Sequence, residues 1–164
     1  MSEWAGNTSW KHAVSYELRS VSSPEDWLHL HAIRRSALFT PGRHSFAYDE
    51  NHPDDRAPGN LPFLLLADSR PVGVVRLDLR GEIAIVRLVA IADEEQGKGH
   101  GRKLDRLIEA EARRRHVRQL RLNAAPAALG YYEKMGWRRA NWDPDELVGL
   151  AENCIQMSKE LESD

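Results

Sequence analysis

The alternation of apolar and polar residues along the chain predicts strands and helices that follow one another in a mixed α/β order. Alternating or short apolar runs predict strands over 14–20, 63–67, 72–79, 82–91, 118–123, 137–142 and 153–159. Apolar residues at helical spacing predict helices over 24–38, 99–115 and 125–135, and 143–150 is expected to contain a helical turn. A segment rich in Pro, Gly, His and Asp over 40–61 is predicted to be a long loop, and loops of this length are usually functional.

Length and composition narrow the class of protein. The chain has 164 residues, of which 41% are hydrophobic and 29% charged, as in soluble globular proteins. We expect residues 1–13 to form a flexible arm and residues 14–164 to form a single domain. The formal net charge of −2 gives no electrostatic reason for a nucleic-acid or membrane partner, and no apolar run reaches the length of a membrane span. A single cysteine, Cys154, and the lack of a signal-peptide pattern favour a cytoplasmic location.

A glycine-rich segment, residues 96–101, follows a predicted strand and an acidic turn and leads into a predicted helix. Glycines let the backbone approach a ligand closely, and the start of a helix attracts anions through its free N–H groups and its dipole. The sequence therefore predicts a site for a phosphorylated ligand. The glycine spacing excludes a P-loop, because Arg102 stands where the second glycine is needed, and a dinucleotide fingerprint, because Gly101 comes one residue early.

The spacing of this segment matches the pattern Q/R-x-x-G-x-G/A, and a second segment follows one helix and one strand later. The second segment comprises Asn123, Ala128 and the run Tyr-Glu-Lys-Met-Gly-Trp at 132–137. On these two segments the chain resembles the GNAT superfamily of N-acetyltransferases over roughly residues 14–159. The resemblance implies an α/β fold with a mostly antiparallel sheet of six to seven strands and about four helices. It also implies that one strand splays from its neighbour at the acyl-CoA site.

The resemblance assigns roles to individual residues. It implies that the glycine-rich loop holds the pyrophosphate of acetyl-CoA, the co-substrate, and that the backbone of the preceding strand contacts the pantetheine and acetyl groups. The implied cofactor-binding residues are Val89, Ile91, Gln96, Gly97, Lys98, Gly99, His100, Gly101 and Asn123. Asn123 is equally well explained as a helix cap ahead of Pro126. Tyr132 matches the family tyrosine that protonates the leaving thiolate, and its alternative is a packing role on the face it shares with Ala128 and Met135.

The general base does not follow from the resemblance. Many histone-type members carry a glutamate three residues before the position of Leu88, and this chain has Ile85 there, which cannot accept a proton. The base is then another residue, a water relay, or absent. The candidates among the residues are Asp78, Glu82, His44, Asp49, Glu50 and His52. This departure favours small-molecule acceptors over histone tails.

A predicted hairpin offers a candidate acceptor pocket. If Arg80 and Gly81 form a two-residue turn, Leu79 pairs with Glu82, so that Arg76 lies opposite Ile85 and Asp78 opposite Ile83. Alternation then places Arg76, Asp78 and Arg87 on one face of the sheet. One interpretation is that the arginines bind a carboxylate of the acceptor while Asp78 orients its amine. The other is a salt bridge that is solvated or covered by a helix.

These patterns together predict an acetyl-CoA-dependent N-acetyltransferase that acts by direct transfer on the amine of a small molecule or an amino-acid-like compound. His44, in the long loop, is a further candidate for the acceptor side of the cleft. Two alternatives remain open: a CoA-binding sensor without catalysis, and a protein or peptide N-acetyltransferase. The His and Asp residues of the loop lack regular spacing, so no metal site is expected. Dimers are common in the family, so a homodimer is compatible with the resemblance.

Overall fold

A seven-stranded sheet organises the structure, a computed structural model that describes residues 12–40 and 47–162. The sheet order is β1-β2-β3-β4-β5-β7-β6, and every neighbouring pair is antiparallel except β4 and β5. The strands are β1 (Tyr16–Ser20), β2 (Asn60–Ala67), β3 (Arg70–Arg80), β4 (Ile83–Ile91), β5 (Gln119–Ala124), β6 (Arg138–Arg139) and β7 (Ile155–Glu160). The predicted mixed, mostly antiparallel sheet is therefore confirmed.

Three α-helices occur in the described residues, against about four expected. They are α1 (Pro24–Ala37), α2 (His100–Arg114) and α3 (Leu129–Lys134). The predicted helix over 125–135 begins instead with a separate 3-10 turn, Pro126–Ala128, and the predicted strand over 137–142 shortens to the two-residue edge strand β6. Within the described ranges, no helix combines the length and the apolar character needed to cross a bilayer.

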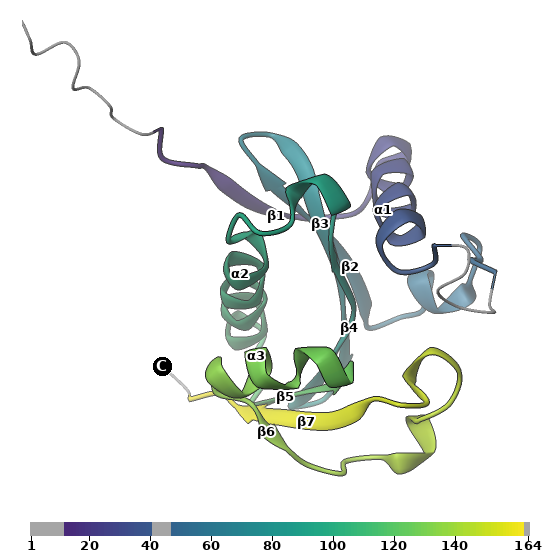
Figure 1. Cartoon of the computed structure of the whole chain (residues 1–164), viewed down its shortest axis with the longest axis vertical. Helices are drawn as coiled ribbons and strands as arrows, with labels where there is room; N and C mark the ends of the chain where they lie inside the picture. Colours follow the sequence, from purple (N-terminus) through teal and green to yellow (C-terminus); the bar gives the residue numbers. More distant parts are fainter. Residues whose placement is uncertain (1–11, 41–46, 163–164) are drawn as a thin grey trace, which may run out of the picture.

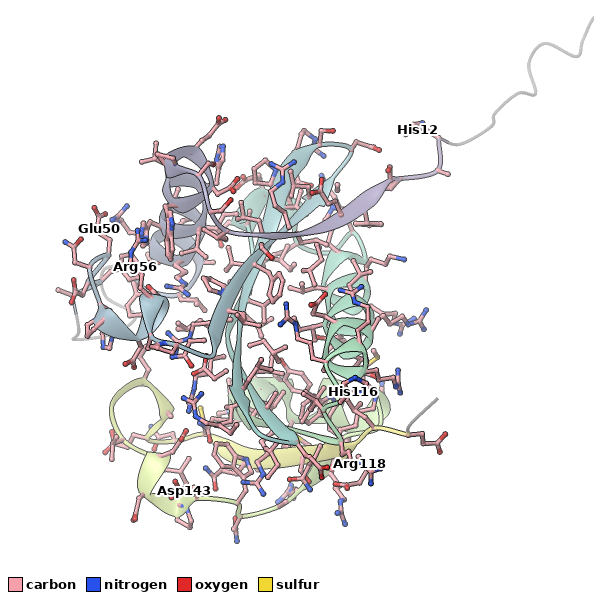
Figure 2. The ribbon with its side chains drawn as sticks, turned by 180° about the vertical axis from the view of Figure 1, so that it is seen from behind. His12, Glu50, Arg56, His116, Arg118 and Asp143 are labelled. Atoms are coloured by element: carbon pink, nitrogen blue, oxygen red, sulfur yellow. The ribbon has the colours of Figure 1, made fainter. Side chains whose placement is uncertain are left out.

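The helices cover the sheet from both sides (Figure 1). On one face, apolar residues of β2–β5 pack against α2 and against partly buried residues of α3. On the other face, Leu30, Ile33 and Ala37 of α1 pack against Leu64 and Val74 of the sheet. Figure 2 shows the consequence from behind: Glu50 and Arg56 lie beside α1, whereas His116 lies at the end of α2 on the far side of the sheet.

The β3–β4 hairpin has a register that differs from the prediction. Arg80 pairs with Ile83, so the two-residue turn consists of Gly81 and Glu82 rather than Arg80 and Gly81. Gly81 has a φ of 65°, and a turn whose first central residue is a left-handed glycine is one of the preferred hairpin connections. From Arg76 to Arg80, each residue of β3 therefore faces a residue two positions further along β4 than predicted, whereas beyond the bulge Gly73 and Val74 face residues three positions further. Because the shift between Arg76 and Arg80 is even, Arg76, Asp78 and Arg87 keep the shared face that was predicted for them.

A bulge and an early end of pairing open the sheet beside β4. Val75 of β3 lies opposite two residues of β4, Leu88 and Val89, and Leu88 has a φ of 52°, which is unusual for a residue with a side chain. The parallel pairing of β4 with β5 ends at Ile85, although β4 continues to Ile91. Figure 1 shows the β5–β7 half of the sheet turned away from β2–β4. This is the splayed strand that the resemblance implied.

The contact between β3 and the end of β4 leads to a prediction on stability. A Cβ added to Gly73 would lie 2.8 Å from Ile91 Cδ1 and 3.2 Å from the Ala90 carbonyl oxygen. We expect Gly73→Ala to lower the free energy of unfolding by about 1–3 kcal/mol, because the two strands must separate to admit the methyl group. Urea denaturation measures this change.

The matched control is Gly130→Ala in α3, where a Cβ meets nothing within 4 Å. Alanine is the better helix former, so this substitution should raise the free energy of unfolding by about 0.5–1 kcal/mol. Equal effects of the two substitutions would contradict the close approach of β3 and β4 at Gly73.

Candidate active site

The glycine-rich loop presents backbone N–H groups at the start of α2. Gly97 and Gly99 have φ values of 79° and 87°, a conformation that glycine adopts without strain. Gly99 is the N-cap of α2 and has no side chain to bond the first N–H groups of this 15-residue helix. A Cβ added at Gly97 or Gly99 would meet nothing within 4 Å, so open space lies beside the loop. These features fit a pyrophosphate group.

Two of the predicted cofactor-binding side chains, those of Gln96 and His100, form hydrogen bonds within the protein. His100 is buried, with Nδ1 2.8 Å from the Tyr16 hydroxyl and Nε2 3.2 Å from Glu95 Oε1. The Gln96 amide donates to the Ile91 carbonyl oxygen over 3.1 Å. These bonds connect the loop to β1, to β4 and to the turn before it. Lys98 is half-exposed and lies 3.4 Å from Glu95, close enough to add positive charge at the loop.

Glu95 is the buried carboxylate that these contacts share. Arg70 donates to Glu95 Oε2 over 2.7 Å, and this bond is the main cause that lowers the pKa of Glu95 to about 2. His100 and Lys98 on the loop are the other partners of Glu95. The carboxylate thus links β3, the turn before the loop and the start of α2.

The end of β5 faces the open edge of β4. Asn123 was expected either near the cofactor or as a helix cap, and the cap interpretation is wrong: the following 3-10 turn is capped by Ala125, without a side-chain bond. The Asn123 amide instead donates to Glu146 Oε1 over 3.3 Å and accepts from Gln156 over 2.9 Å. Val89 and Ile91 lie on the stretch of β4 that has no pairing with β5, as the resemblance implied.

Tyr132 lies on α3 and packs against the core on the α2 side of the sheet. Its ring meets those of Tyr131 and Trp137 edge to face, with centroids 5.3 Å and 5.8 Å away. Burial, followed by the charge of Asp105, raises the pKa of Tyr132, so the phenol keeps its proton at neutral pH. Within the described part of the chain no group hydrogen-bonds the Tyr132 hydroxyl. The predicted acid role and the packing role are both compatible with this position.

Asp105 on α2 explains why the neighbouring tyrosine is the weaker acid candidate. The Tyr131 hydroxyl donates to Asp105, and this bond engages its proton. Burial raises the pKa of Asp105 to about 6, so its carboxyl is mainly ionised at pH 7 and its charge acts on both tyrosines. Asp105 could have been suspected from the sequence, because it lies three residues before Ile108 on the apolar face of the helix.

The three residues predicted on one face of the hairpin do meet. Arg76 donates to Asp78 through Nε and Nη2 over 2.7 Å and 3.0 Å, and Arg87 donates to Asp78 Oδ2 over 2.8 Å. They lie on the α1 side of the sheet with Val74, and Arg76 pairs directly with Arg87 across the strands rather than with Ile85. The like charges tolerate this pairing because Asp78, only 2% exposed, lies between them.

The cluster extends beyond the predicted residues in both directions. At one end, Asp55 accepts from Arg76 over 3.1 Å and from Arg34 of α1 over 2.8 Å. At the other end, Arg87 donates to both oxygens of Glu146, in the connector between β6 and β7, over 2.8 Å and 2.9 Å. Arg34 could have been suspected, because it follows the buried Leu30 by one helical turn. Nothing in the sequence indicates Asp55 or Glu146, because the loops that contain them show no periodic pattern of apolar and polar residues.

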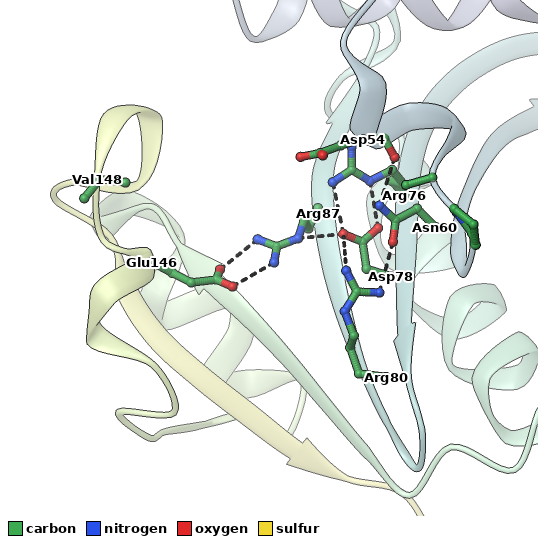
Figure 3. Close-up of a pocket in the computed structure, with 10 residues that line it drawn as sticks. Asp54, Asn60, Arg76, Asp78, Arg80, Arg87, Glu146 and Val148 are labelled. Atoms are coloured by element: carbon green, nitrogen blue, oxygen red, sulfur yellow. Dashed lines mark hydrogen bonds and ion pairs between the residues drawn. The ribbon is translucent and has the colours of Figure 1, made fainter.

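A pocket of about 400 Å³ opens onto this cluster (Figure 3). Its lining brings together the loop before β2, the α1 face of β3 and β4, and the connector after β6, through Asp54, Ala57, Pro58, Asn60, Arg76, Asp78, Arg80, Arg87, Glu146 and Val148. Both interpretations of the hairpin residues therefore hold in part: they form salt bridges and they line a pocket. Their role in binding an acceptor stays a prediction.

The candidate general bases are scattered. Glu82 lies in the hairpin turn, at the opposite end of β4 from the bulge. Asp78 is buried between two arginines. In the loop, Asp49, Glu50 and His52 are exposed, and Glu50 is paired with Arg35. His44 lies outside the described residues. Among the described residues, no group of three or more His, Cys, Asp or Glu side chains is arranged to hold a metal ion.

Comparison with known families identifies the chain. The family model described as "Acetyltransferase (GNAT) domain" matches residues 45–160, more than half of the sequence. The chain therefore belongs to the GNAT acetyltransferase family and is an N-acetyltransferase, a family that uses acetyl-CoA as co-substrate. No curated protein sequence matches the chain.

Solved structures show the same fold at low sequence identity. The ribosomal-protein-S18-alanine N-acetyltransferase from Escherichia coli aligns with a TM-score of 0.68 and 21% identity over 93% of this chain and 96% of its own. An N-acetyltransferase from Thermoplasma acidophilum in complex with coenzyme A aligns with a TM-score of 0.68 and 16% identity over 91% and 99%. The N-acetylglutamate synthase from Neisseria gonorrhoeae, complexed with coenzyme A and L-arginine, gives 0.63 and 21% over 91% of this chain and 33% of its own.

The low pKa of Glu95 leads to a prediction on pH and stability. A carboxyl whose pKa falls from its usual 4.5 to about 2 on folding stabilises the native state above pH 4.5, and this contribution is lost as the pH falls from about 4.5 to about 2. We expect Glu95→Gln to be less stable than the wild type at pH 7, with a difference that shrinks over this range. Urea denaturation at a series of pH values measures it.

Glu94→Gln is the control, because Glu94 belongs to the same turn but is exposed. Its stability difference from the wild type should be small and should change little with pH. A Glu95→Gln difference that is the same at pH 3 and pH 7 would rule out the ion pair with Arg70 as the source of the stabilisation.

Proposed function

We propose that this N-acetyltransferase moves the acetyl group of acetyl-CoA directly to the amine of a small-molecule or amino-acid-like acceptor in a ternary complex. The observation that carries the proposal is the gap between β4 and β5, which has a different environment on each side. Tyr132 and the apolar core lie on the α2 side, and the polar pocket lined by Arg76, Asp78 and Arg87 lies on the α1 side. A thioester held in the gap would thus have an acid on one side and an acceptor site on the other.

The residues of the chain supply three parts of the chemistry. The loop before α2 would hold the pyrophosphate, and the unpaired edge of β4 beyond Ile85 would offer N–H groups to the pantetheine and to the oxyanion that forms as the amine attacks. Tyr132 would give its proton to the thiolate as the carbon–sulfur bond breaks. The attacking amine must first lose a proton, since an alkyl ammonium has a pKa near 10.

A small acceptor is favoured by the shape and charge of the pocket. Its volume of about 400 Å³ lies within the range of small-ligand sites, and three arginines and three carboxylates line it. A protein or peptide acceptor, such as the substrate named for the Escherichia coli relative, would need an open groove for residues that flank the amine. A CoA-binding sensor would bind acetyl-CoA without releasing thiol on any amine.

The role of Tyr132 can be tested by substitution. We expect Tyr132→Phe to lower kcat by about 100-fold, because general acid catalysis contributes typically 10²–10⁴-fold, with little change in the KM for acetyl-CoA. Release of free thiol from acetyl-CoA, followed across a panel of amines, amino acids and short peptides, measures both the acceptor class and this loss.

Tyr131→Phe is the matched control, because it removes the same atom from the neighbouring residue. The Tyr131 hydroxyl is already bonded to Asp105, so its loss should lower the thermal unfolding midpoint and change kcat by less than about fivefold. Wild-type kcat in Tyr132→Phe would show that Tyr132 only packs. Thiol release on peptides but on no small amine would overturn the small-acceptor proposal.

A further inference from the structure

We infer that the guanidinium of Arg87 is the carboxylate site for an amino-acid-type acceptor, and that Glu146 occupies this site until the acceptor carboxylate displaces it. The inference rests on the proposed function and names its substrate class: compounds that carry a carboxylate close to the amine. Four observations on Arg87 and Glu146 carry it.

The first observation is that Arg87 is held in one orientation by a contact that does not involve Glu146. Its Nε donates over 2.8 Å to Asp78, which is 2% exposed and also bonded to Arg76. The opposite edge of the guanidinium, with Nη1 and Nη2, points to the pocket and makes two parallel bonds to Glu146 (Figure 3). Two parallel N–H donors fixed in this way match the two oxygens of any carboxylate.

The second observation is the charge of the group behind the pocket. Arg34, Arg76, Arg80 and Arg87 each lie within 4 Å of one of two buried carboxylates, Asp55 and Asp78, so this group carries two positive charges in excess. In addition, Nε and Nη2 of Arg34 are buried without a hydrogen-bond partner among the described residues. Donors thus outnumber acceptors, so the group attracts a further carboxylate. Glu146 offsets one of the two excess charges here.

The third observation is that Glu146 differs from the other two carboxylates in how it is held. Its side chain is 24% exposed, whereas those of Asp55 and Asp78 are 4% and 2% exposed. It lies on a single 3-10 turn, Pro144–Glu146, in the connector between β6 and β7, and not on a strand. A side chain on such a segment can move away from Arg87 without breaking the pairing of the sheet.

The fourth observation is the position of the pair relative to the gap. Besides Arg87 on β4, Glu146 accepts a bond from Asn123 on β5, so its carboxylate spans the two strands where they have separated. An acceptor that takes the place of Glu146 would put its carboxylate at Arg87. An amine one carbon away would then lie toward the unpaired part of β4, where the proposed function puts the thioester. Simple amines lack the group that replaces Glu146.

The experiment compares each L-amino acid with the amine obtained by removing its carboxylate. Suitable pairs are phenylalanine with phenethylamine, histidine with histamine, and leucine with isopentylamine. The measured quantity is the ratio of the two kcat/KM values in the thiol-release assay, taken for the pair with the highest activity. Because variants are compared on the same pair, the intrinsic difference in reactivity between the two amines cancels.

The two residues should change this ratio in opposite directions. Arg87→Met should lower the ratio by about 10- to 100-fold, since it removes a two-pronged charged contact. Arg87→Lys should lower it less, because it keeps the charge and loses the fork. Glu146→Gln should raise the ratio by about twofold to fivefold, because it weakens the competitor for Arg87. A merely structural role of Glu146 would not favour the amino acid over its matched amine.

A control variant tests whether charge alone is responsible. Arg139 of β6 is exposed and does not line the pocket, so Arg139→Met should change the ratio by less than about twofold. Thermal unfolding of each variant shows that it is folded, and if Arg87→Met is not, Arg87→Lys carries the test. An unchanged ratio in Arg87→Lys and Arg87→Met, or a lower ratio in Glu146→Gln, would overturn the inference.

Binding separates a failure of this inference from a failure of the proposed function. If the wild type releases no thiol with any pair, calorimetric titration of the same amino acids and amines into the wild type and Arg87→Lys, each holding CoA, still tests the carboxylate site. Binding of amino acids that is tighter than that of amines and depends on Arg87 supports the site. Equal binding of both, or binding of neither, overturns it.

Discussion

The early end of hydrogen bonding between β4 and β5 is the constraint on which the rest of the site depends. Two strands that start as a parallel pair and then diverge leave one edge of β4 without a strand partner. If such an edge is exposed, a strand of another protein molecule can pair with it. If it is buried, its unpaired N–H and C=O groups destabilise the fold. A ligand with its own amide groups, such as pantetheine, can satisfy them. The bulge at Leu88 bends β4 at this point and so belongs to the same feature.

The charged group on the α1 face is a second determinant of the architecture. A buried ion pair gives little net stability, but removing one partner costs about 3–5 kcal/mol, because an uncompensated charge remains. Arg34, Asp55 and Arg76 therefore restrict where the loop before β2 can lie on the sheet. The loop lines one side of the pocket, so the ion pairs that fix the loop also fix the shape of that side of the pocket.

The sequence predicts the fold better than it predicts the site. Strand and helix positions follow from periodicity, and the glycine spacing with the segment around Tyr132 indicates the family. The prediction that Arg76, Asp78 and Arg87 share one face of the sheet is confirmed, although the predicted register was wrong. A shift of two residues keeps each of these side chains on the same face. What the sequence lacks is long-range pairing. Glu146 meets Arg87 across 59 residues, and no local pattern encodes that contact. The burial of His100 likewise depends on Tyr16, 84 residues away.

The contact between Tyr16 and His100 joins an outer strand of the sheet to the start of α2. Outer strands exchange their amide hydrogens through local openings that cost much less than global unfolding. Each opening of β1 would release the imidazole that anchors the loop, and ligand bound at the loop would oppose that opening. If acetyl-CoA binds at this loop, its affinity and the protection of the β1 amides would therefore be coupled, so that hydrogen exchange in β1 would change when the loop is occupied.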